Sequence, residues 1–212
     1  MAKTIIFDLD GTLTDSGEGI INCAKYTLEC FHLPIPTPEE MRTFVGPPLV
    51  DSFIKFGVDP KEADRAVEIY RDRYIPVGMY ENAPYPGIES LLQQLKGQGH
   101  CLCIATCKPE QMAGDILSHF GLAQYFDHIC GASTDRTRKT KEAVIAHLLQ
   151  QATPQGKLIM VGDTHIDVLG AAFHRIPTIG VAWGYGTVES MIEAGAAAIV
   201  NNTQELLELL NQ

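Results

Sequence analysis

Aspartate side chains are grouped in two short segments of this chain. Asp8 and Asp10 stand at the end of one apolar run, and Asp163 and Asp167 follow another. A single aspartate at the end of a strand usually caps a helix or forms a turn. Four at the ends of two neighbouring strands would converge in one pocket, because open α/β sheets bind ligands at the carboxyl ends of their strands. Such crowded carboxylates repel each other unless a hard divalent cation joins them, so we predict a Mg²⁺ site.

The spacing of the first pair indicates two chemical tasks. One residue separates Asp8 from Asp10, so a continued extended backbone would project both side chains to the same side. One carboxylate can then attack a substrate while the other moves protons. Gly11 follows directly and permits the tight turn that brings backbone groups near a bound anion. Asp163 and Asp167 are four residues apart and would share one face if a helix begins there.

Groups that fit a phosphate follow a third apolar run. Thr106 offers a hydroxyl group, and the amide of Cys107 adds a second donor for phosphate oxygens. Lys108 ends this segment and either contacts the substrate or lies at the edge of the site. His165, beside the second aspartate pair, has the same two interpretations. Together with Gly11, the residues Thr106, Cys107 and Lys108 are candidates for phosphate binding.

A further cation is expected from residues 136–141, which read Arg-Thr-Arg-Lys-Thr-Lys. The chain has 16 Lys and Arg against 26 Asp and Glu, a formal net charge of −10, so an anionic substrate needs a local positive charge. Lys141 is the favoured phosphate ligand because a helical pattern follows it directly. Lys139 is the alternative, and its other interpretation is a solvated surface charge.

Short apolar runs alternate with segments of helical periodicity, which is the pattern of a parallel sheet covered by helices. We therefore predict the α/β class, with a Rossmann-like, doubly wound parallel sheet. The predicted strands are residues 4–9, 100–106, 157–161, 178–182 and 197–200, and the helical stripes include 88–95, 112–120 and 144–149.

One long segment interrupts this alternation. Residues 16–83 show helical patterning, at 20–31 and 63–70, with proline-rich joints and no convincing strand. We predict that they form a small helical domain inserted after the first strand, and that residues 1–15 and 84–212 form the α/β core.

The four chemical segments, in this order, resemble the motifs of the haloacid dehalogenase-like (HAD) phosphohydrolases. The resemblance spans essentially the whole chain, and the helical block resembles the inserted cap of the phosphoglycolate-phosphatase subgroup. The first and fourth motifs are highly specific, whereas the second is not. One departure concerns the third motif, where many relatives have proline after the lysine and this chain has Glu142. The residues that carry the resemblance are the run 7–13 (Phe-Asp-Leu-Asp-Gly-Thr-Leu), Thr106, Lys141, Gly162-Asp163 and Asp167.

The resemblance implies a role for each of these groups. Asp8 would be the nucleophile that forms an aspartyl-phosphate, and Asp10 the general acid and base. Mg²⁺ would be held by Asp8, the Asp10 carbonyl and Asp163, with Asp167 as direct or indirect support. The implied catalytic set is Asp8, Asp10, Thr106 and Lys141.

The implied substrate is a small phosphate monoester, such as phosphoglycolate or a 5′-nucleotide. The helical insert would act as a lid that excludes water during phosphoryl transfer. Its loop 46–49, Gly-Pro-Pro-Leu, with Arg42 nearby, either faces the leaving group or contains prolines that only break helices.

Three other functions use similar residues. A phosphomutase such as β-phosphoglucomutase would share the aspartate pair of the first motif. Enzymes of that kind have a Glu-Asp pair in the fourth motif, where this chain has Gly162-Asp163, which favours hydrolysis. A true dehalogenase lacks the second aspartate, so Asp10 argues against it. A phospho-accepting module similar to response-regulator receivers would be shorter and lack the helical insert.

Composition excludes several classes. A chain with 45% hydrophobic and 20% charged residues is typical of a soluble globular protein and excludes disorder. It has no basic stripe for a nucleic acid or an anionic membrane, and no apolar run near the roughly 20 residues of a membrane helix. The six cysteines show no CxxC pairing, so we expect reduced, mostly buried thiols and a cytoplasmic protein. The oligomeric state, monomer or homodimer, stays open.

Overall fold

A six-stranded parallel sheet forms the centre of the α/β part of the chain. The computed structural model describes residues 2–46, 48–135, 137–154 and 156–212. Neighbouring strands pair in parallel throughout the sheet, which confirms the predicted α/β class. In spatial order, the strands are β5 (His128–Ala132), β4 (Cys101–Pro109), β1 (Lys3–Phe7), β6 (Lys157–Gly162), β7 (Thr178–Val181) and β8 (Ala198–Val200).

The central strand β1 sets the position of the site. Ile5, Ile6 and Phe7 are fully buried, as expected for a strand that is covered on both faces. Phe7 pairs with Ile104 of β4 on one side and with Val161 of β6 on the other. The carboxyl ends of β1, β4 and β6 therefore lie side by side at one edge of the sheet.

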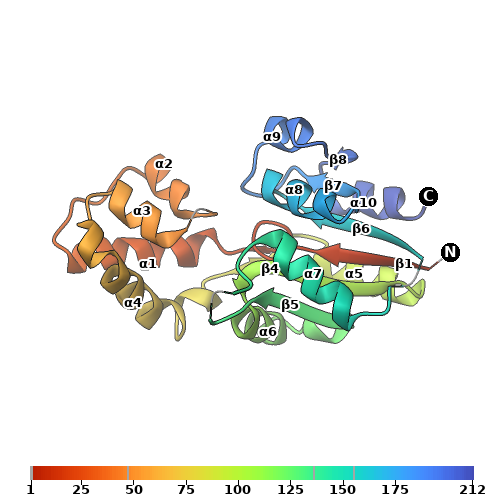
Figure 1. The fold of residues 1–212 in the computed structure, drawn as a ribbon, viewed down its shortest axis with the longest axis horizontal. Coiled ribbons are helices and arrows are strands. Elements are labelled where there is room, and N and C mark those ends of the chain that lie inside the picture. The colour runs from red at the N-terminus through yellow and green to blue at the C-terminus, as the bar shows by residue number, and fades with distance from the viewer. Residues whose placement is uncertain (1, 47, 136, 155) are drawn as a thin grey trace. The chain divides into compact units, whose positions relative to one another are not determined.

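Helices cover both faces of this sheet (Figure 1). On one face, buried side chains of two helices pack against Ile6, Cys103 and Met160, and these helices contribute Val144, Ile145, Leu148 and Ala171. The helices of the α/β unit are α5 (Ile88–Gly97), α6 (Glu110–His119), α7 (Lys141–Gln151), α8 (His165–Phe173), α9 (Val188–Glu193) and α10 (Thr203–Leu210), with a short 3₁₀ turn at Ala123–Tyr125.

Two details of the predicted strands are wrong. The edge strand β5 was not expected, because its sequence His-Ile-Cys-Gly-Ala has only a short apolar run with a glycine inside it. The first strand ends at Phe7 rather than residue 9, because the carbonyl of Leu9 accepts hydrogen bonds from the amides of Leu13 and Thr14 and so begins a turn.

Residues Ser16–Ala83 form a separate compact unit, and Met1–Asp15 with Pro84–Gln212 form the other. The smaller unit is helical, and the buried side chains Ala66, Val67 and Tyr70 of one helix belong to its core. Its helices are α1 (Gly17–Cys30), α2 (Pro38–Met41), α3 (Leu49–Lys55) and α4 (Ala63–Tyr74), with 3₁₀ turns at Arg42–Phe44, Pro60–Glu62 and Gly78–Tyr80.

Several prolines of this unit begin helices. Pro38 follows the N-cap Thr37 of α2, whose hydroxyl and the carboxylate of Glu40 form a reciprocal capping box. Pro48 is the N-cap of α3. Pro47 of the loop 46–49 lies outside the described residues, so a contact of this loop with a leaving group stays a prediction.

A second, two-stranded sheet lies where the chain passes between the units. It consists of β2 (Thr14–Asp15) and β3 (Ala83–Pro84). These short strands fall at the limits of the segment in which we expected only helices.

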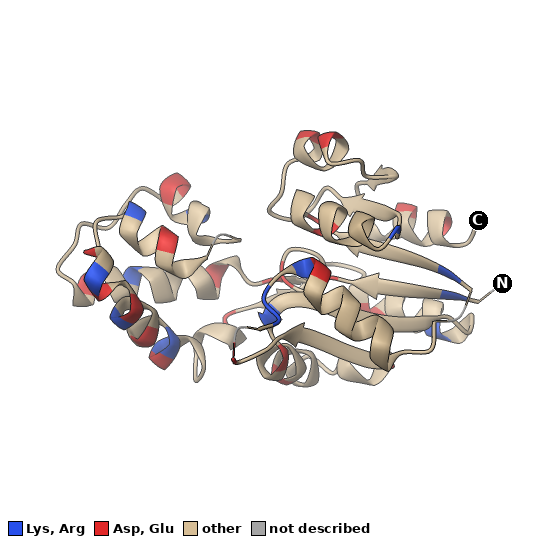
Figure 2. Ribbon diagram, viewed as in Figure 1, with Lys and Arg blue, Asp and Glu red and all other residues tan. Residues whose placement is uncertain are grey.

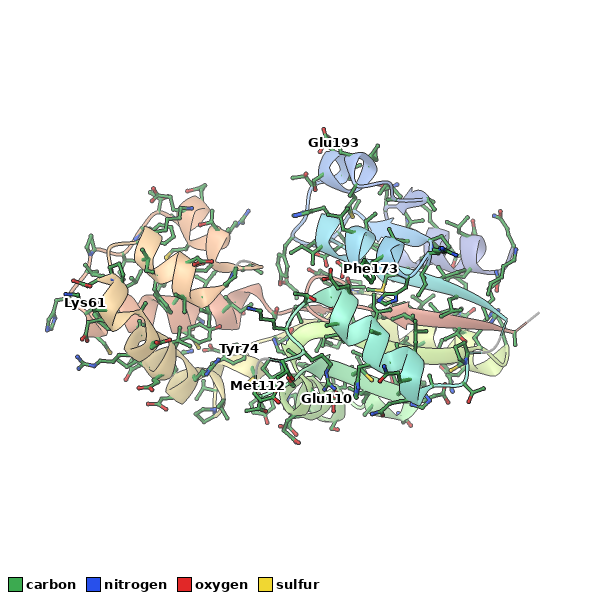
Figure 3. All side chains as sticks on the ribbon, in the orientation of Figure 1. Lys61, Tyr74, Glu110, Met112, Phe173 and Glu193 are labelled. Atoms are coloured by element: carbon green, nitrogen blue, oxygen red, sulfur yellow. The ribbon has the colours of Figure 1, made fainter. Side chains whose placement is uncertain are left out.

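The described surface carries dispersed positive charge and an exposed aromatic side chain. The described Lys and Arg residues are dispersed in the view of Figure 2, without a continuous basic stripe. Phe173 at the end of α8 is 74% exposed, and Figure 3 shows it among the side chains of the α/β unit. None of the described helices is long and apolar enough to cross a membrane.

The cysteines of the described chain are free thiols, as expected. The expectation that most are buried is met by only half of them. Cys23, Cys103 and Cys130 are buried, Cys101 is half-buried, and Cys30 and Cys107 are exposed.

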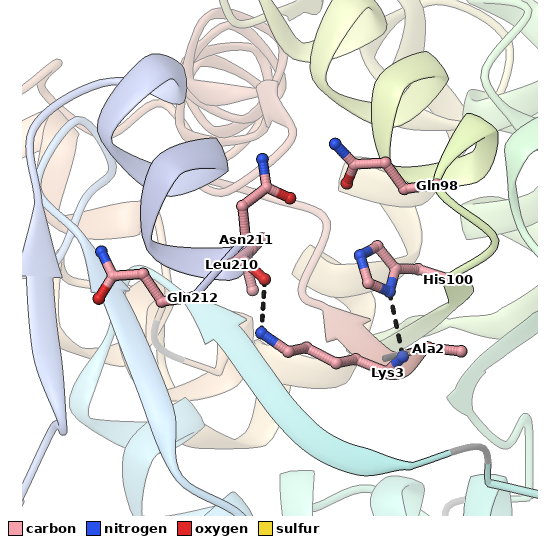
Figure 4. Close-up of a pocket in the computed structure, with 7 residues that line it drawn as sticks. All are labelled: Ala2, Lys3, Gln98, His100, Leu210, Asn211 and Gln212. Atoms are coloured by element: carbon pink, nitrogen blue, oxygen red, sulfur yellow. Dashed lines mark hydrogen bonds between the residues drawn. The ribbon is translucent and has the colours of Figure 1, made fainter.

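A pocket of about 310 Å³ lies at the amino end of β1, away from the strand ends that carry the aspartates (Figure 4). Here the backbone N–H of Lys3 donates to Nδ1 of His100 at 3.0 Å, and the Lys3 ammonium donates to the carbonyl of Leu210 at 2.5 Å. These bonds tie the start of the central strand to the segments around it.

Candidate active site

Three carboxylates meet at the carboxyl edge of the sheet. Asp8 follows β1, Asp163 follows β6, and Asp167 lies in the first turn of α8. One carboxylate oxygen of each lies within 4.8 Å of those of the other two. Asp163 and Asp167 are fully buried and Asp8 is only 9% exposed. The sheet order therefore brings these three predicted residues together.

Lys141, the first residue of α7, joins this group. Its ammonium nitrogen lies 2.8 Å from Oδ1 of Asp8 and 2.8 Å from Oδ1 of Asp167. It also donates to the carbonyl of Ala105 in β4, again at 2.8 Å. Burial lowers the pKa of Lys141, but the charges of Asp167 and Asp8 more than reverse this, so the pKa is raised and the ammonium form persists.

The carboxylates carry more negative charge than this one lysine balances. Burial raises the pKa of Asp8 to about 6, against the attraction of Lys141. Burial, with the charges of Asp8 and Asp167, raises the pKa of Asp163 to about 7. Three carboxylates against one ammonium leave two charges to compensate, and the ligands are all oxygen. Such a donor set fits a hard divalent cation such as Mg²⁺.

Two of the carboxylates are held rigidly by their neighbours. Oδ1 of Asp163 accepts from the Thr12 hydroxyl at 3.1 Å, and Oδ2 accepts from the backbone N–H of Tyr185 at 2.8 Å. Oδ2 of Asp167 accepts from the amide of Thr164 at 3.0 Å and from its hydroxyl at 2.8 Å. Preorganised carboxylates of this kind bind a cation without the cost of reorienting.

Glycines allow these segments to approach each other closely. Gly11 has φ +83°, a conformation that side chains with a Cβ rarely adopt, and this confirms the predicted tight turn. A Cβ at Gly11 or Gly184 would overlap the side chain of Asp163, and one at Gly162 would overlap Asp167. Backbone therefore passes directly against the carboxylates.

Asp10 lies outside the group of three. Its Oδ2 pairs with the ammonium of Lys108 at 2.6 Å, and its Oδ1 is buried without a hydrogen-bond partner among the described residues. Because β1 ends at Phe7 and the chain turns at Leu9, the extended geometry that would align Asp8 and Asp10 is absent. The two carboxylates of the first motif thus have different cationic partners, Lys141 for Asp8 and Lys108 for Asp10.

The remaining predicted residues lie at the ends of β4 and around α7 and α8. Thr106 is buried, and its hydroxyl accepts from the amide of Lys108 at 3.2 Å. Cys107 is exposed, as are Lys139 and His165. Helix α8 begins only at His165, so Asp163 precedes it and the expectation that Asp163 and Asp167 share one helical face is wrong.

Sequence reasoning missed the segment that follows β7. The indole N–H of Trp183 donates to the carbonyl of Thr12 at 3.0 Å, two residues before the Tyr185 amide that binds Asp163. The Tyr185 hydroxyl donates to Asp15 at 2.7 Å. The signal was present: Trp-Gly-Tyr-Gly follows a predicted strand, at the same edge as the other motifs.

The family model of the haloacid dehalogenase-like hydrolases matches residues 5–181 of this chain. The chain belongs to this family. A crystal structure of a predicted phosphatase from Clostridium acetobutylicum superimposes with a TM-score of 0.91 at 42% identity, covering 100% of this chain and 99% of that one. The predicted family, fold class and assignment as a hydrolase of the phosphatase type are thereby confirmed.

Two similar curated proteins have names that describe different activities. Tyrosine-protein kinase PtkA of Mycobacterium tuberculosis is 40% identical over 208 residues, 98% of this chain and 71% of that protein. A 5′-nucleotidase of Pseudomonas aeruginosa is 39% identical over 189 residues, 88% of this chain and 86% of that protein. Proteins about 40% identical to this chain are thus named both as a kinase, which transfers a phosphoryl group to a protein, and as a nucleotidase, which removes one from a nucleotide.

Proposed function

We propose that this HAD enzyme hydrolyses small phosphate monoesters with Mg²⁺, through an aspartyl-phosphate on Asp8. The observation that carries the proposal is the buried group of Asp8, Asp163 and Asp167 with the ammonium of Lys141. A phosphate dianion and a carboxylate nucleophile repel each other, so catalysis depends mainly on charge compensation and alignment.

The cation would be held by Asp8, the Asp10 carbonyl and Asp163, with Asp167 as support. When bound, Mg²⁺ would neutralise the charge that the carboxylates and the phosphate bring together. The structural support is that Asp163 is fixed at both oxygens by neutral donors, Thr12 and Tyr185, and by no described cationic side chain. Its charge therefore remains available to a metal.

Lys141 and Thr106 would position the phosphate. Lys141 holds Oδ1 of Asp8, which leaves the second carboxylate oxygen of Asp8 as the attacking atom. The Thr106 hydroxyl and the amide of Cys107 would donate to phosphate oxygens. Both donors lie in β4, the strand next to β1, so they are already at the edge of the sheet that carries Asp8.

The reaction would have two steps. In the first, Asp8 attacks phosphorus, the bond from phosphorus to the leaving oxygen breaks, and protonated Asp10 gives its proton to that oxygen. In the second, Asp10 takes a proton from water, whose oxygen attacks the phosphorus of the acyl phosphate. Inorganic phosphate leaves, and the Asp8 carboxylate is restored.

The proposed substrates are metabolites of the phosphoglycolate or 5′-nucleotide type. The name of the Pseudomonas relative favours nucleotides, and the subgroup resemblance favours phosphoglycolate. The helical unit Ser16–Ala83 is proposed to act as the cap that selects among leaving groups. Steady-state kinetics with a series of esters tests this. Substitution of a cap residue that contacts the leaving group should change KM for esters with large leaving groups and leave KM for a minimal ester unchanged.

The decisive experiment is a Mg²⁺-dependent screen of metabolite phosphates for phosphate release. Asp8→Asn should reduce turnover to background, since the amide is a poor nucleophile. Asp115→Asn is the matched control, because this half-buried aspartate of α6 accepts a hydrogen bond from the side-chain amide of Gln111 in its own helix, and the variant should keep full activity. Normal turnover by Asp8→Asn would exclude the covalent route.

A second variant tests the role of Asp10. Asp10→Asn should lower kcat by a factor of about 10²–10⁴, the usual contribution of general acid and base catalysis. The loss should be smaller for esters with good leaving groups, which need no proton. An equal loss for all esters would indicate that Asp10 serves only the structure, through its pair with Lys108.

The same screen separates the other candidate activities. The PtkA relative favours tyrosine phosphorylation as a second candidate, so one arm supplies ATP and a tyrosine peptide. A hexose phosphate with a coupled assay detects a phosphomutase. Stable phospho-Asp8 without turnover of any ester would instead identify a phospho-accepting module.

A further inference from the structure

A second group of metal-binding side chains lies in the α/β unit, on different residues from the aspartate site. We propose that Glu110, Cys130 and His147 form a binding site for a transition-metal ion of the Zn²⁺ type. This proposal goes beyond the proposed phosphatase function and does not depend on it.

The three side chains come from three elements that pack together. Glu110 begins α6 and is labelled in Figure 3, Cys130 lies in the edge strand β5, and His147 lies in the second turn of α7. One potential ligand atom from each lies within 4.8 Å of the other two. Tetrahedral ligands at Zn²⁺ distances of about 2.0–2.3 Å stand closer together than this limit, so small side-chain rotations suffice.

Neighbouring groups already orient two of the three. Oε2 of Glu110 accepts from the amide of Gly131 at 3.1 Å and from the guanidinium of Arg138 at 2.7 Å. Gln151, one turn after His147, hydrogen-bonds to Nε2 of its ring at 3.0 Å. Metal ligands in proteins are commonly supported in this way. Oε1 of Glu110, which neither bond uses, would be the ligand.

The chemistry of the group selects the metal. A thiol, an imidazole and a carboxylate suit Zn²⁺ or Co²⁺, whereas Mg²⁺ prefers an all-oxygen set such as the aspartate site. Cys130 is 2% exposed and packs against apolar residues of the core, so it is protected from bulk solvent. On binding, the thiol would release its proton to solvent and the thiolate would bond to the metal.

Occupation of this site would join elements that also carry the aspartate site. Helix α7 begins with Lys141, and Cys130 pairs in register with Ala105, whose carbonyl holds the Lys141 ammonium. A metal bound between α6, β5 and α7 would therefore restrict the motion of the helix that carries Lys141 relative to the sheet. This would appear as a rise in thermal stability.

The test is titration of the whole protein with Co²⁺ in excess Mg²⁺, which competes with Co²⁺ for all-oxygen groups such as the aspartates. We expect one tightly bound Co²⁺ with a sulfur-to-cobalt charge-transfer band in the near ultraviolet, which an all-oxygen site cannot produce. Cys130→Ser should abolish this band, and stoichiometric Zn²⁺ should remove it from the wild type. Glu110→Gln and His147→Asn should weaken binding about tenfold or more.

Cys30→Ser is the matched control, since this exposed thiol lies in the helical unit and its loss should leave the band intact. If Cys130→Ser fails to fold, the half-buried Glu110 and His147 variants decide. The proposal is wrong if the wild type shows no band, if the band survives in Cys130→Ser, or if Glu110→Gln and His147→Asn both bind with wild-type affinity.

Discussion

At the scale of single residues, Lys141 has the most constrained surroundings in the site. An ammonium group has three N–H donors, and the structure offers it three oxygens at 2.8 Å, on Asp8, Asp167 and Ala105. Burial of such a charge is costly unless every donor is paired. Lys139, two residues earlier, is exposed and separated from this arrangement.

This difference predicts the effects of two matched substitutions. Lys141→Met should lower kcat by a factor of about 10²–10³, because it removes a charge that faces the nucleophile and the phosphate. Lys139→Met should leave kcat within experimental error. Steady-state kinetics at saturating Mg²⁺, with circular dichroism to verify folding, measures both. Equal losses in the two variants would contradict the assignment of Lys141.

At the scale of elements, glycines determine how closely strand-end segments approach. Gly184 follows β7, and a Cβ there would overlap the Asp163 side chain and the carbonyl of Gly11. Gly114 lies within α6, where a Cβ would meet nothing within 4 Å. Gly184 is therefore needed for the close approach of its backbone to Asp163, whereas Gly114 makes no such approach and only weakens its helix.

Alanine at these two positions should therefore have opposite effects. Gly184→Ala should displace Asp163 and raise the Mg²⁺ concentration needed for half-maximal turnover. Gly114→Ala should raise the free energy of unfolding by about 0.5–1 kcal/mol through helix propensity and leave turnover unchanged. Metal titrations of activity and urea unfolding measure the two effects. A Gly184→Ala enzyme with an unchanged Mg²⁺ requirement would show that Asp163 tolerates displacement.

At the scale of the whole molecule, a histidine far from the site contributes to the pH dependence of stability. Burial lowers the pKa of His100 below its ordinary value of 6.5, and the positive charge of Lys3 lowers it further. Nδ1 of His100 must stay unprotonated to accept from the amide of Lys3. Below pH 6.5 the unfolded chain binds this proton and the folded chain does not, so acid favours unfolding.

Between pH 7.5 and 5.5 we expect the thermal midpoint of the wild type to shift downward relative to that of His100→Asn, because the buried carboxylates of the site, whose raised pKa values act in the opposite direction, titrate in both proteins. Asparagine keeps an acceptor near the Nδ1 position but does not titrate. His119→Asn, which changes an exposed histidine of α6, should show the same change between the two pH values as the wild type. Calorimetry at the two pH values measures both variants. If the midpoints of His100→Asn and the wild type change by the same amount, His100 does not contribute to the pH dependence.

The sequence by itself determined the α/β class, most strands and the segments that bear the site. Apolar runs such as the one before Asp8 reveal strands because a sheet buried on both faces requires continuous apolar side chains. The strand β5 escaped detection because an edge strand of five residues with a glycine needs little apolar sequence. Local patterns therefore predicted the strands with apolar runs, the edge strand β8 among them, and missed β5 and the two-residue strands β2 and β3, whose sequences carry no comparable run.

Only the tertiary structure decided which side chains meet. Placing β1 beside β6 brings Asp8 to Asp163 across 155 residues of chain, and placing it beside β4 pairs Asp10 with Lys108. The amide of Tyr185 binds Asp163 as a backbone donor, which any residue type except proline carries, so the run Trp-Gly-Tyr-Gly could indicate the segment but not which residue donates. Strand order and backbone hydrogen bonds are properties of the assembled sheet, and the spacing of residues along the chain does not specify them.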